Sequence, residues 1–292
     1  MIIVTGADGI VGRAVCNALT KLQKSVLPVI RQKRTFTAAN AYIADLSLAG
    51  ALDALRDYPI EAIVHLAAAV PHSMTYPDTQ RSADVTRRMD RNVKAFAESS
   101  DVPVVYMSTC GLYDRSSEEV KYEDNALQIR IESPYFSAKL DGESLFEACR
   151  KATIIRLAAP IGPGLKPGIV LSRFIMAARA NVPIQIWGSG SREQNFIDAR
   201  DVADIVLKVL ADPRPCTLNV AGESPVTMVG LAKAVIGAVG GTFVFSGKAD
   251  PREGETARYS IAKARELYGW SPVYNLEASC GLLLKEDFEG NT

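Results

Sequence analysis

The chain has 292 residues and carries 33 basic and 33 acidic side chains, so its formal net charge is zero. This balance gives no electrostatic basis for binding nucleic acid or an anionic membrane. The length favours one large domain plus a smaller lobe. No run of about 20 apolar residues predicts a membrane span, and the apolar N-terminus is too short for a signal peptide.

The cysteines and histidines bear on whether the protein has disulfide bonds or a metal site. The five cysteines show neither Cys-x-x-Cys spacing nor a disulfide framework, which favours a reducing, cytoplasmic location. The two histidines, His65 and His72, belong to no cluster with metal-ligand spacing. We therefore expect no metal site.

The first predicted elements form a phosphate-binding corner. A buried strand over residues 2–5 leads into a glycine turn, and an amphipathic helix follows over about 10–22. Gly6 permits the tight turn, Gly9 lets the backbone approach a pyrophosphate, and Gly12 allows close packing of helix on strand. The free N–H groups at the helix N-terminus would then face the phosphates.

Strands and helices alternate along the rest of the first 220 residues, which predicts an α/β fold with a Rossmann-type, doubly wound parallel sheet. Further strands are expected over 25–30, 62–66, 104–108, 153–157 and 217–220, and helices near 50–57, 82–99, 134–150 and 201–211. Asp201 is the expected cap of the last helix.

Glycines and prolines interrupt this pattern from Ile161 onward and indicate a smaller, discontinuous C-terminal lobe. We expect residues 1–160 and 195–221 to form the dinucleotide-binding domain. Residues 161–194 and 222–292 would form the substrate-binding lobe.

The end of the second strand predicts the form of the dinucleotide. The acid that binds the ribose of NAD usually lies about 20 residues beyond the glycine turn, and Arg31 occupies that position here. Arg31 clusters with Lys33 and Arg34, and no acid lies between Asp8 and Asp45. Because a guanidinium pairs well with a 2′-phosphate, NADP is preferred over NAD. A basic, solvated loop is the alternative interpretation.

A tyrosine and a lysine lie one helical turn apart in Tyr135-Phe-Ser-Ala-Lys139. Ser133 as the cap and Pro134 at the first helical position predict a helix that begins just before Tyr135. Residues four apart share a helix face, so the ammonium of Lys139 would lower the phenol pKa of Tyr135 from its usual value of about 10.

Four motifs together resemble the extended short-chain dehydrogenase/reductases, and more narrowly the sugar-nucleotide epimerase, dehydratase and 4-ketoreductase group. They are Thr5-Gly-x-x-Gly-x-x-Gly12, His65-Leu-Ala-Ala68, Ser108-Thr109-x-x-x-Tyr113 and Tyr135-x-x-x-Lys139. Later segments follow in the family's order, among them Phe196-Ile-x-x-x-Asp201 and Gly269-Trp-x-Pro272.

The resemblance implies reversible hydride transfer between a sugar carbinol and a nicotinamide. It makes Tyr135 the proton donor, Lys139 its activator and the ligand of the nicotinamide ribose, and Thr109 the hydrogen-bond donor to the reacting oxygen. Ser108 is the adjacent alternative to Thr109. Tyr113 would contact substrate, supply a second acid or form part of the wall. Besides the glycines, the cofactor residues implied are Ile10, Val11, Asp45, Leu46, Leu66, Ala67 and Ala68.

Several positions depart from the family pattern and weaken the case for a nucleotide on the substrate. Ala159 and Ile161 replace an Asn and an aromatic residue, and Gln194 stands where an Arg normally binds the diphosphate. Arg192, two residues earlier, is the candidate substitute. Cys110-Gly111 replaces the Asp-Glu pair of the dehydratases, which argues against dehydration.

Three interpretations follow. The leading one is an NADP-dependent reductase of a keto group on a sugar or nucleotide sugar, and the second is an epimerase that retains NAD. The third is a dinucleotide-binding redox sensor without turnover. No nucleic-acid or membrane partner is expected, and a homodimer is left open.

Overall fold

The computed structural model of the chain describes residues 1–32, 40–71, 76–127 and 133–283. Its centre is a seven-stranded parallel sheet in the order β11-β6-β5-β4-β1-β2-β3. The strands are β1 (Ile2–Thr5), β2 (Val26–Ile30), β3 (Tyr42–Ile43), β4 (Ala62–His65), β5 (Val104–Thr109), β6 (Ala152–Leu157) and β11 (Cys216–Val220). The order reverses at β1, as in a doubly wound fold, so the predicted fold class is confirmed.

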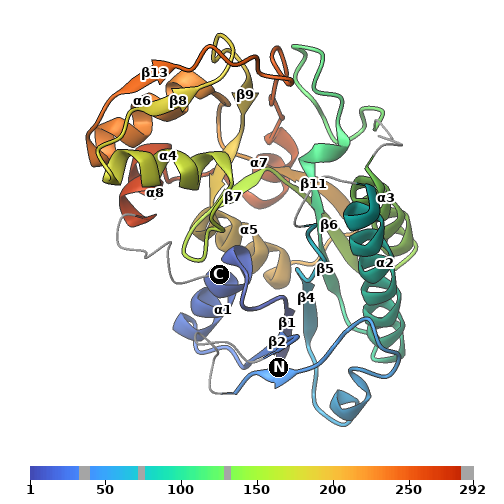
Figure 1. Cartoon of the computed structure of the whole chain (residues 1–292). Coiled ribbons are helices and arrows are strands. Elements are labelled where there is room, and N and C mark those ends of the chain that lie inside the picture. Colours follow the sequence, from blue (N-terminus) through green and yellow to red (C-terminus); the bar gives the residue numbers. More distant parts are fainter. Residues whose placement is uncertain (33–39, 72–75, 128–132, 284–292) are drawn as a thin grey trace.

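Helices cover both faces of this sheet (Figure 1). On one face α1 (Ile10–Lys21) packs beside α5 (Ala199–Ala211), and on the other α2 (Tyr76–Ser99) packs beside α3 (Pro134–Glu147). Apolar side chains of each helix pair form a core with one face of the strands. Because helices cover both faces, the central strands are apolar along their length rather than alternating.

A smaller lobe lies beyond the carboxyl ends of the central strands (Figure 1). Its elements are β7 (Ala159–Ile161), α4 (Val170–Arg179), β8 (Ile184–Ile186), β9 (Glu193–Gln194), β10 (Phe196–Asp198), β12 (Val226–Thr227), α6 (Met228–Val239), β13 (Phe243–Phe245) and α8 (Leu276–Leu283). A third core joins apolar side chains of α4, β8, α6 and α8. The predicted division of the chain into two domains stays a prediction.

Some predicted elements differ from those of the structure. The helix expected near 50–57 is one 3-10 turn, η1 (Asp53–Leu55), and α2 begins at Tyr76 rather than near 82. The short edge strand β3 was not predicted. No described helix is long and apolar enough to cross a membrane.

The predicted cap of α5 was wrong. Asp198, at the end of β10, caps the helix by accepting a hydrogen bond from the amide of Arg200 at 2.9 Å. Asp201 instead lies in the first turn, where its carboxylate accepts hydrogen bonds from the amides of Val273 and Tyr274 at 2.9 and 3.1 Å. Asp201 thus fastens the segment after α7 (Ala262–Tyr268) to α5.

Candidate active site

The glycine turn between β1 and α1 has the geometry of a phosphate cradle. Gly6 has a φ of +64°, which favours glycine, and a Cβ on Gly12 would stand 2.3 Å from the carbonyl oxygen of Gly6. Gly9 is exposed and caps α1, which begins with Ile10 and Val11. The helix N-terminus and the bare backbone before it therefore fit a pyrophosphate.

The residues after β4 lie directly against this turn. The hydroxyl of Thr5 accepts hydrogen bonds from the amides of Leu66 and Ala67 at 3.1 and 3.2 Å. A Cβ on Gly6 would stand 2.9 Å from the amide nitrogen of Ala67. The half-buried Ala68 follows. The structure thus brings two of the predicted cofactor segments together.

Arg31 is exposed immediately after β2, while Lys33 and Arg34 lie outside the described residues. The carboxylate of Asp45 accepts hydrogen bonds from the hydroxyl and amide of Ser47, which lower the pKa of Asp45. The charge of Arg31 acts in the same direction, so Asp45 lies within electrostatic range of Arg31. The carbonyl of the buried Leu46 accepts a hydrogen bond from Asn92 of α2 at 2.8 Å.

Helix α3 carries the tyrosine and lysine pair. It begins at Pro134 as predicted, but the hydroxyl of the capping residue Ser133 has no hydrogen-bond partner among the described residues. Lys139 is buried, and its ammonium donates to the carbonyl of Met107 in β5 at 2.8 Å. This bond fastens α3 across the carboxyl half of β5.

The pKa of Tyr135 moves opposite to the predicted direction. Burial raises it to about 12, and the nearby carboxylate of Asp90 adds to the increase. Lys139 directs its ammonium to Met107 and to the hydroxyl of Tyr106. The phenol of Tyr135 is therefore held in its protonated form at neutral pH, as a proton donor requires.

Thr109 lies at the end of β5, next to the start of α3. Its half-buried hydroxyl accepts a hydrogen bond from the amide of Gly111 at 3.0 Å. A Cβ on Gly111 would stand 2.4 Å from the ring of Phe136, the neighbour of Tyr135. The absence of a side chain at Gly111 therefore lets the first turn of α3 approach Thr109.

Ser108 and Tyr113 are turned away from this position. Ser108 is buried and donates to the carboxylate of Glu143. Tyr113 is fully buried, and its hydroxyl donates to Asn219 at 2.8 Å and accepts from Arg156 at 2.8 Å. Tyr113 therefore forms part of a buried network, which fits the wall residue that was one of its predicted roles, and its contact with substrate stays a prediction. Ser108 is likewise held by a buried partner, and its role as the alternative to Thr109 stays a prediction.

The predicted substrate residues of the lobe have partners within the chain. Arg192 forms an ion pair with Asp250 at 2.7 Å and lies against the sulfur of Met228. Gln194 belongs to β9, which pairs antiparallel with β12. No hydrogen bond or ion pair among the described residues joins either side chain to Tyr135 or Thr109.

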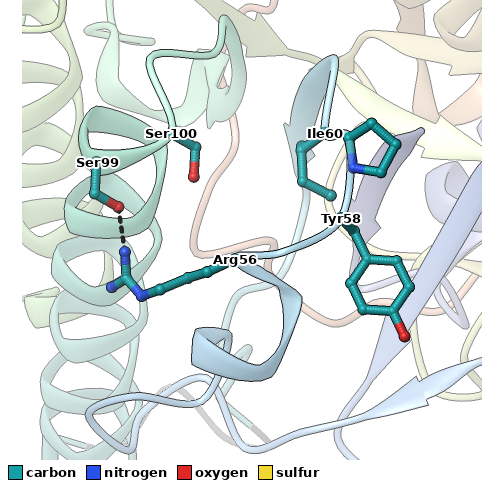
Figure 2. A pocket seen from close by; sticks show the side chains of 6 residues that line it. Arg56, Tyr58, Ile60, Ser99 and Ser100 are labelled. Atoms are coloured by element: carbon teal, nitrogen blue, oxygen red, sulfur yellow. Dashed lines mark hydrogen bonds between the residues drawn. The ribbon is translucent and has the colours of Figure 1, made fainter.

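A cavity of about 360 Å³ lies at the other end of the sheet (Figure 2). Its lining residues precede β4 and β5, and the guanidinium of Arg56 donates to Ser99 at 2.6 Å across it. Ligands of doubly wound sheets bind at the carboxyl ends of the strands, so this cavity is not part of the candidate site.

Asp90 was missed by the sequence reasoning. It lies on the inner face of α2 and accepts hydrogen bonds from Tyr106 at 2.9 Å and from His65 at 3.0 Å. Its signal in the sequence is an acid at a core-facing helix position, between the buried residues Met89 and Val93.

Comparison with known proteins places these features in a family. A model of the NAD dependent epimerase/dehydratase family matches residues 2–221. An uncharacterised UDP-glucose epimerase of Bacillus subtilis is 26% identical over 94% of both chains. A dTDP-4-dehydro-6-deoxy-D-allose reductase of Streptomyces bikiniensis is 26% identical over 82% of this chain and 81% of its own.

A solved structure shows the same fold. The UDP-glucose 4-epimerase of Thermus thermophilus in complex with NAD superposes with a TM-score of 0.85, at 20% identity, over 100% of this chain and 99% of its own. The matched family model covers the glycine turn, Thr109, Tyr135 and Lys139. The chain belongs to the NAD dependent epimerase/dehydratase family.

Proposed function

We propose that the protein is an NAD(P)-dependent reductase of a keto group on a nucleotide-linked or otherwise activated sugar. The observation that carries the proposal is the position of Thr109 beside the first turn of α3, which bears Tyr135 and Lys139. A bound dinucleotide would supply the hydride, held by the glycine turn and the segment after β4. The residues of the chain would supply the proton and the hydrogen bonds.

Each of the three side chains has a distinct part. Tyr135, whose pKa is raised to about 12, holds the proton that the substrate oxygen needs as its charge develops. Thr109 accepts from Gly111 and keeps its own proton free to donate to the same oxygen. Lys139 is fixed on Met107 and Tyr106 and would direct its remaining proton to the nicotinamide ribose.

The preference for NADP rests on Arg31. Its exposed guanidinium follows β2 at the position where an acid would read the ribose of NAD. Asp45 would oppose a 2′-phosphate at this position, because it lies close enough for Arg31 to lower its pKa.

An epimerase is the second candidate, and the names of the Bacillus and Thermus relatives favour it. Both reactions use the same three side chains. They differ in whether the cofactor leaves after each turnover. A dehydratase is disfavoured because Cys110, at a position of the dehydratase acid pair, is buried and donates its thiol proton to the carbonyl of Arg156.

A nucleotide on the substrate would have to engage the lobe. Arg192 is the candidate for its diphosphate, and the phosphate oxygens would compete with Asp250 for the guanidinium. A sugar activated in another way would leave the ion pair between Arg192 and Asp250 intact. A cytoplasmic location and a homodimer stay predictions.

Acid extraction of the purified protein, followed by a turnover assay, tests the proposal. A reductase should purify largely free of dinucleotide and consume NADPH stoichiometrically with a 4-keto sugar nucleotide. Near-stoichiometric bound NAD, with interconversion of a fully hydroxylated sugar nucleotide and no change in absorbance at 340 nm, would establish the epimerase. Dinucleotide binding without either turnover would favour the redox sensor.

A further inference from the structure

A continuous chain of buried polar side chains links Lys139 to the glycine turn. The ammonium of Lys139 donates to the hydroxyl of Tyr106 at 3.4 Å, and Tyr106 donates to Asp90 at 2.9 Å. On its other side Asp90 pairs with Nε2 of His65 at 3.0 Å, and Nδ1 of His65 lies 2.7 Å from the hydroxyl of Thr5. All five side chains are at most 3% exposed.

A count of donors and acceptors assigns the direction of these hydrogen bonds. The hydroxyl of Thr5 accepts from the amides of Leu66 and Ala67, which occupies both of its lone pairs. Its single proton must therefore point to Nδ1 of His65, which accepts it. The proton of the neutral imidazole then lies on Nε2 and is donated to Asp90. From both ends of this series of side chains, each hydrogen bond is therefore donated in the direction of Asp90.

Helix α3 packs tightly on the link between Tyr106 and Asp90. A Cβ on Gly142 would stand 2.0 Å from the hydroxyl oxygen of Tyr106 and 2.6 Å from a carboxylate oxygen of Asp90. The ring of Tyr106 also stacks on Phe146 at 4.5 Å. Glycine at position 142 therefore lets α3, which carries Lys139, lie directly against this hydrogen bond.

We propose that Asp90 is a positioning residue, which acts through Tyr106 on Lys139 and through His65 and Thr5 on the dinucleotide-binding turn. The inference rests on the proposed function, because it assumes that Lys139 and the turn hold the same dinucleotide. One carboxylate would then align the two ends of the cofactor site and provide the negative charge that accompanies the buried ammonium.

The charges around Lys139 show why Asp90 should affect the pH at which the protein loses its affinity for the dinucleotide. Burial lowers the pKa of Lys139, and the carboxylates of Asp90 and Glu143 raise it against that effect. Glu143 is paired with Arg156 at 2.8 Å, whereas Asp90 has only neutral donors in direct contact among the described residues. The neutral phenols of Tyr106 and Tyr135 and the imidazole of His65 complete the surroundings.

The test is the pH dependence of dinucleotide binding, measured by fluorescence titration of the full chain with NADPH and NAD between pH 6 and 10. The parent protein should lose affinity on the alkaline side as Lys139 loses its proton. Asp90→Asn removes the negative charge while keeping the shape. It should move the midpoint of this loss to lower pH by roughly one unit or more.

Two further variants separate charge from contact. Tyr106→Phe keeps the charge of Asp90 and the stacked ring but cuts the link, so it should weaken binding about tenfold, the scale of one hydrogen bond to a charged group, without moving the midpoint. Asp84→Asn makes the same charge change on α2 at a half-exposed position and should leave affinity and midpoint unchanged. Thermal unfolding in the absence of ligand checks that each variant is folded.

The outcomes distinguish this inference from the proposed function. A folded Asp90→Asn variant with the parent's midpoint, a parent whose affinity is flat from pH 6 to 10, or a Tyr106→Phe variant with the parent's affinity would each overturn the role of Asp90. If Asp90→Asn does not fold, the affinity of Tyr106→Phe decides. A parent protein that binds neither dinucleotide at any pH would overturn the proposed function, and this inference with it.

Discussion

An ion pair of the sheet region and an ion pair of the lobe differ in how far they are exposed to water. Between β6 and α3, Arg156 and Glu143 form a pair in which both side chains are at most 6% exposed. In the lobe, Arg258 pairs with Glu193, and the two side chains are 37% and 14% exposed. The first pair is sealed within the core, and the second remains open to water and to competing anions.

This difference suggests that one region of the molecule sets the reaction and the other selects the substrate. In the sheet region the charged groups are fixed by buried partners, so the position of Lys139 is set before a ligand arrives. In the lobe, Arg258 is partly open to water in its pair with Glu193, and Arg192 pairs with Asp250 (side chains 17% and 6% exposed), so an anionic substrate would compete with these carboxylates for the two guanidinium groups. We therefore expect the sheet region to determine the reaction, and the lobe to determine which sugar derivative enters.

The largest expected effect of a substitution lies in the buried pair. Glu143→Gln leaves the guanidinium of Arg156 buried without its counter-charge, which should lower the free energy of unfolding by about 3–5 kcal/mol. Urea unfolding followed by circular dichroism measures the change. Glu147→Gln, at an exposed position of the same helix, is the matched control and should have little effect. Equal stability of the two variants would mean that the buried pair contributes no more than a surface charge.

Removal of the proposed acid comes next. Tyr135→Phe deletes one hydroxyl, so folding and dinucleotide binding should persist while turnover falls roughly 100-fold or more. Steady-state kinetics at saturating cofactor measure the loss, and Tyr122→Phe at an exposed position serves as the control. Near-normal turnover of Tyr135→Phe would assign the proton to another group. Tyr113 is an unsuitable substitute, because its hydroxyl is held by Asn219 and Arg156.

Much of the sheet region was predictable because its signals are local. The glycine turn depends on backbone conformations that few other residues adopt, and the first turn of α3 is set by Pro134. Helical spacing likewise placed Tyr135 and Lys139 on neighbouring turns. These features need no knowledge of distant parts of the chain.

The errors arose where distant segments decide the outcome. Helical spacing suggested that Lys139 would act on Tyr135, but β5 supplies a carbonyl and a phenol that take up its ammonium. The sequence left three roles open for Tyr113, and it could not show that Asn219 of β11 accepts a hydrogen bond from its hydroxyl within the core. The role of Asp90 likewise depends on partners from β4 and β5.

A smaller effect is expected for the substitution of Arg31, at the end of β2. Arg31→Asp should weaken NADPH binding and improve NADH binding by about tenfold each, because a carboxylate repels the 2′-phosphate and accepts hydrogen bonds from a free ribose. Fluorescence titration gives both dissociation constants. Arg56→Asp, at the opposite end of the sheet, makes the same charge change and should preserve the parent's preference. Equal affinity of the parent protein for the two dinucleotides would contradict the assignment of Arg31.

The smallest effect is expected for the partly exposed ion pair between Arg258 and Glu193 in the lobe. Burial favours a raised pKa for Glu193, but hydrogen bonds from Arg258 and the amide of Ala257 outweigh it and hold the pKa below its usual value. The folded state therefore binds this proton less readily than the unfolded chain, so the stabilisation is present above the unfolded value of about 4.3 and is lost as the pH falls through the folded pKa. Glu193→Gln should lower the urea midpoint at pH 7 by less than Glu143→Gln does. The midpoints of parent and Glu193→Gln should approach each other as the pH falls through the folded pKa of Glu193, because its carboxyl then takes up a proton. A difference between them that stays unchanged as the pH is lowered would show that the contribution of Glu193 is not its charge.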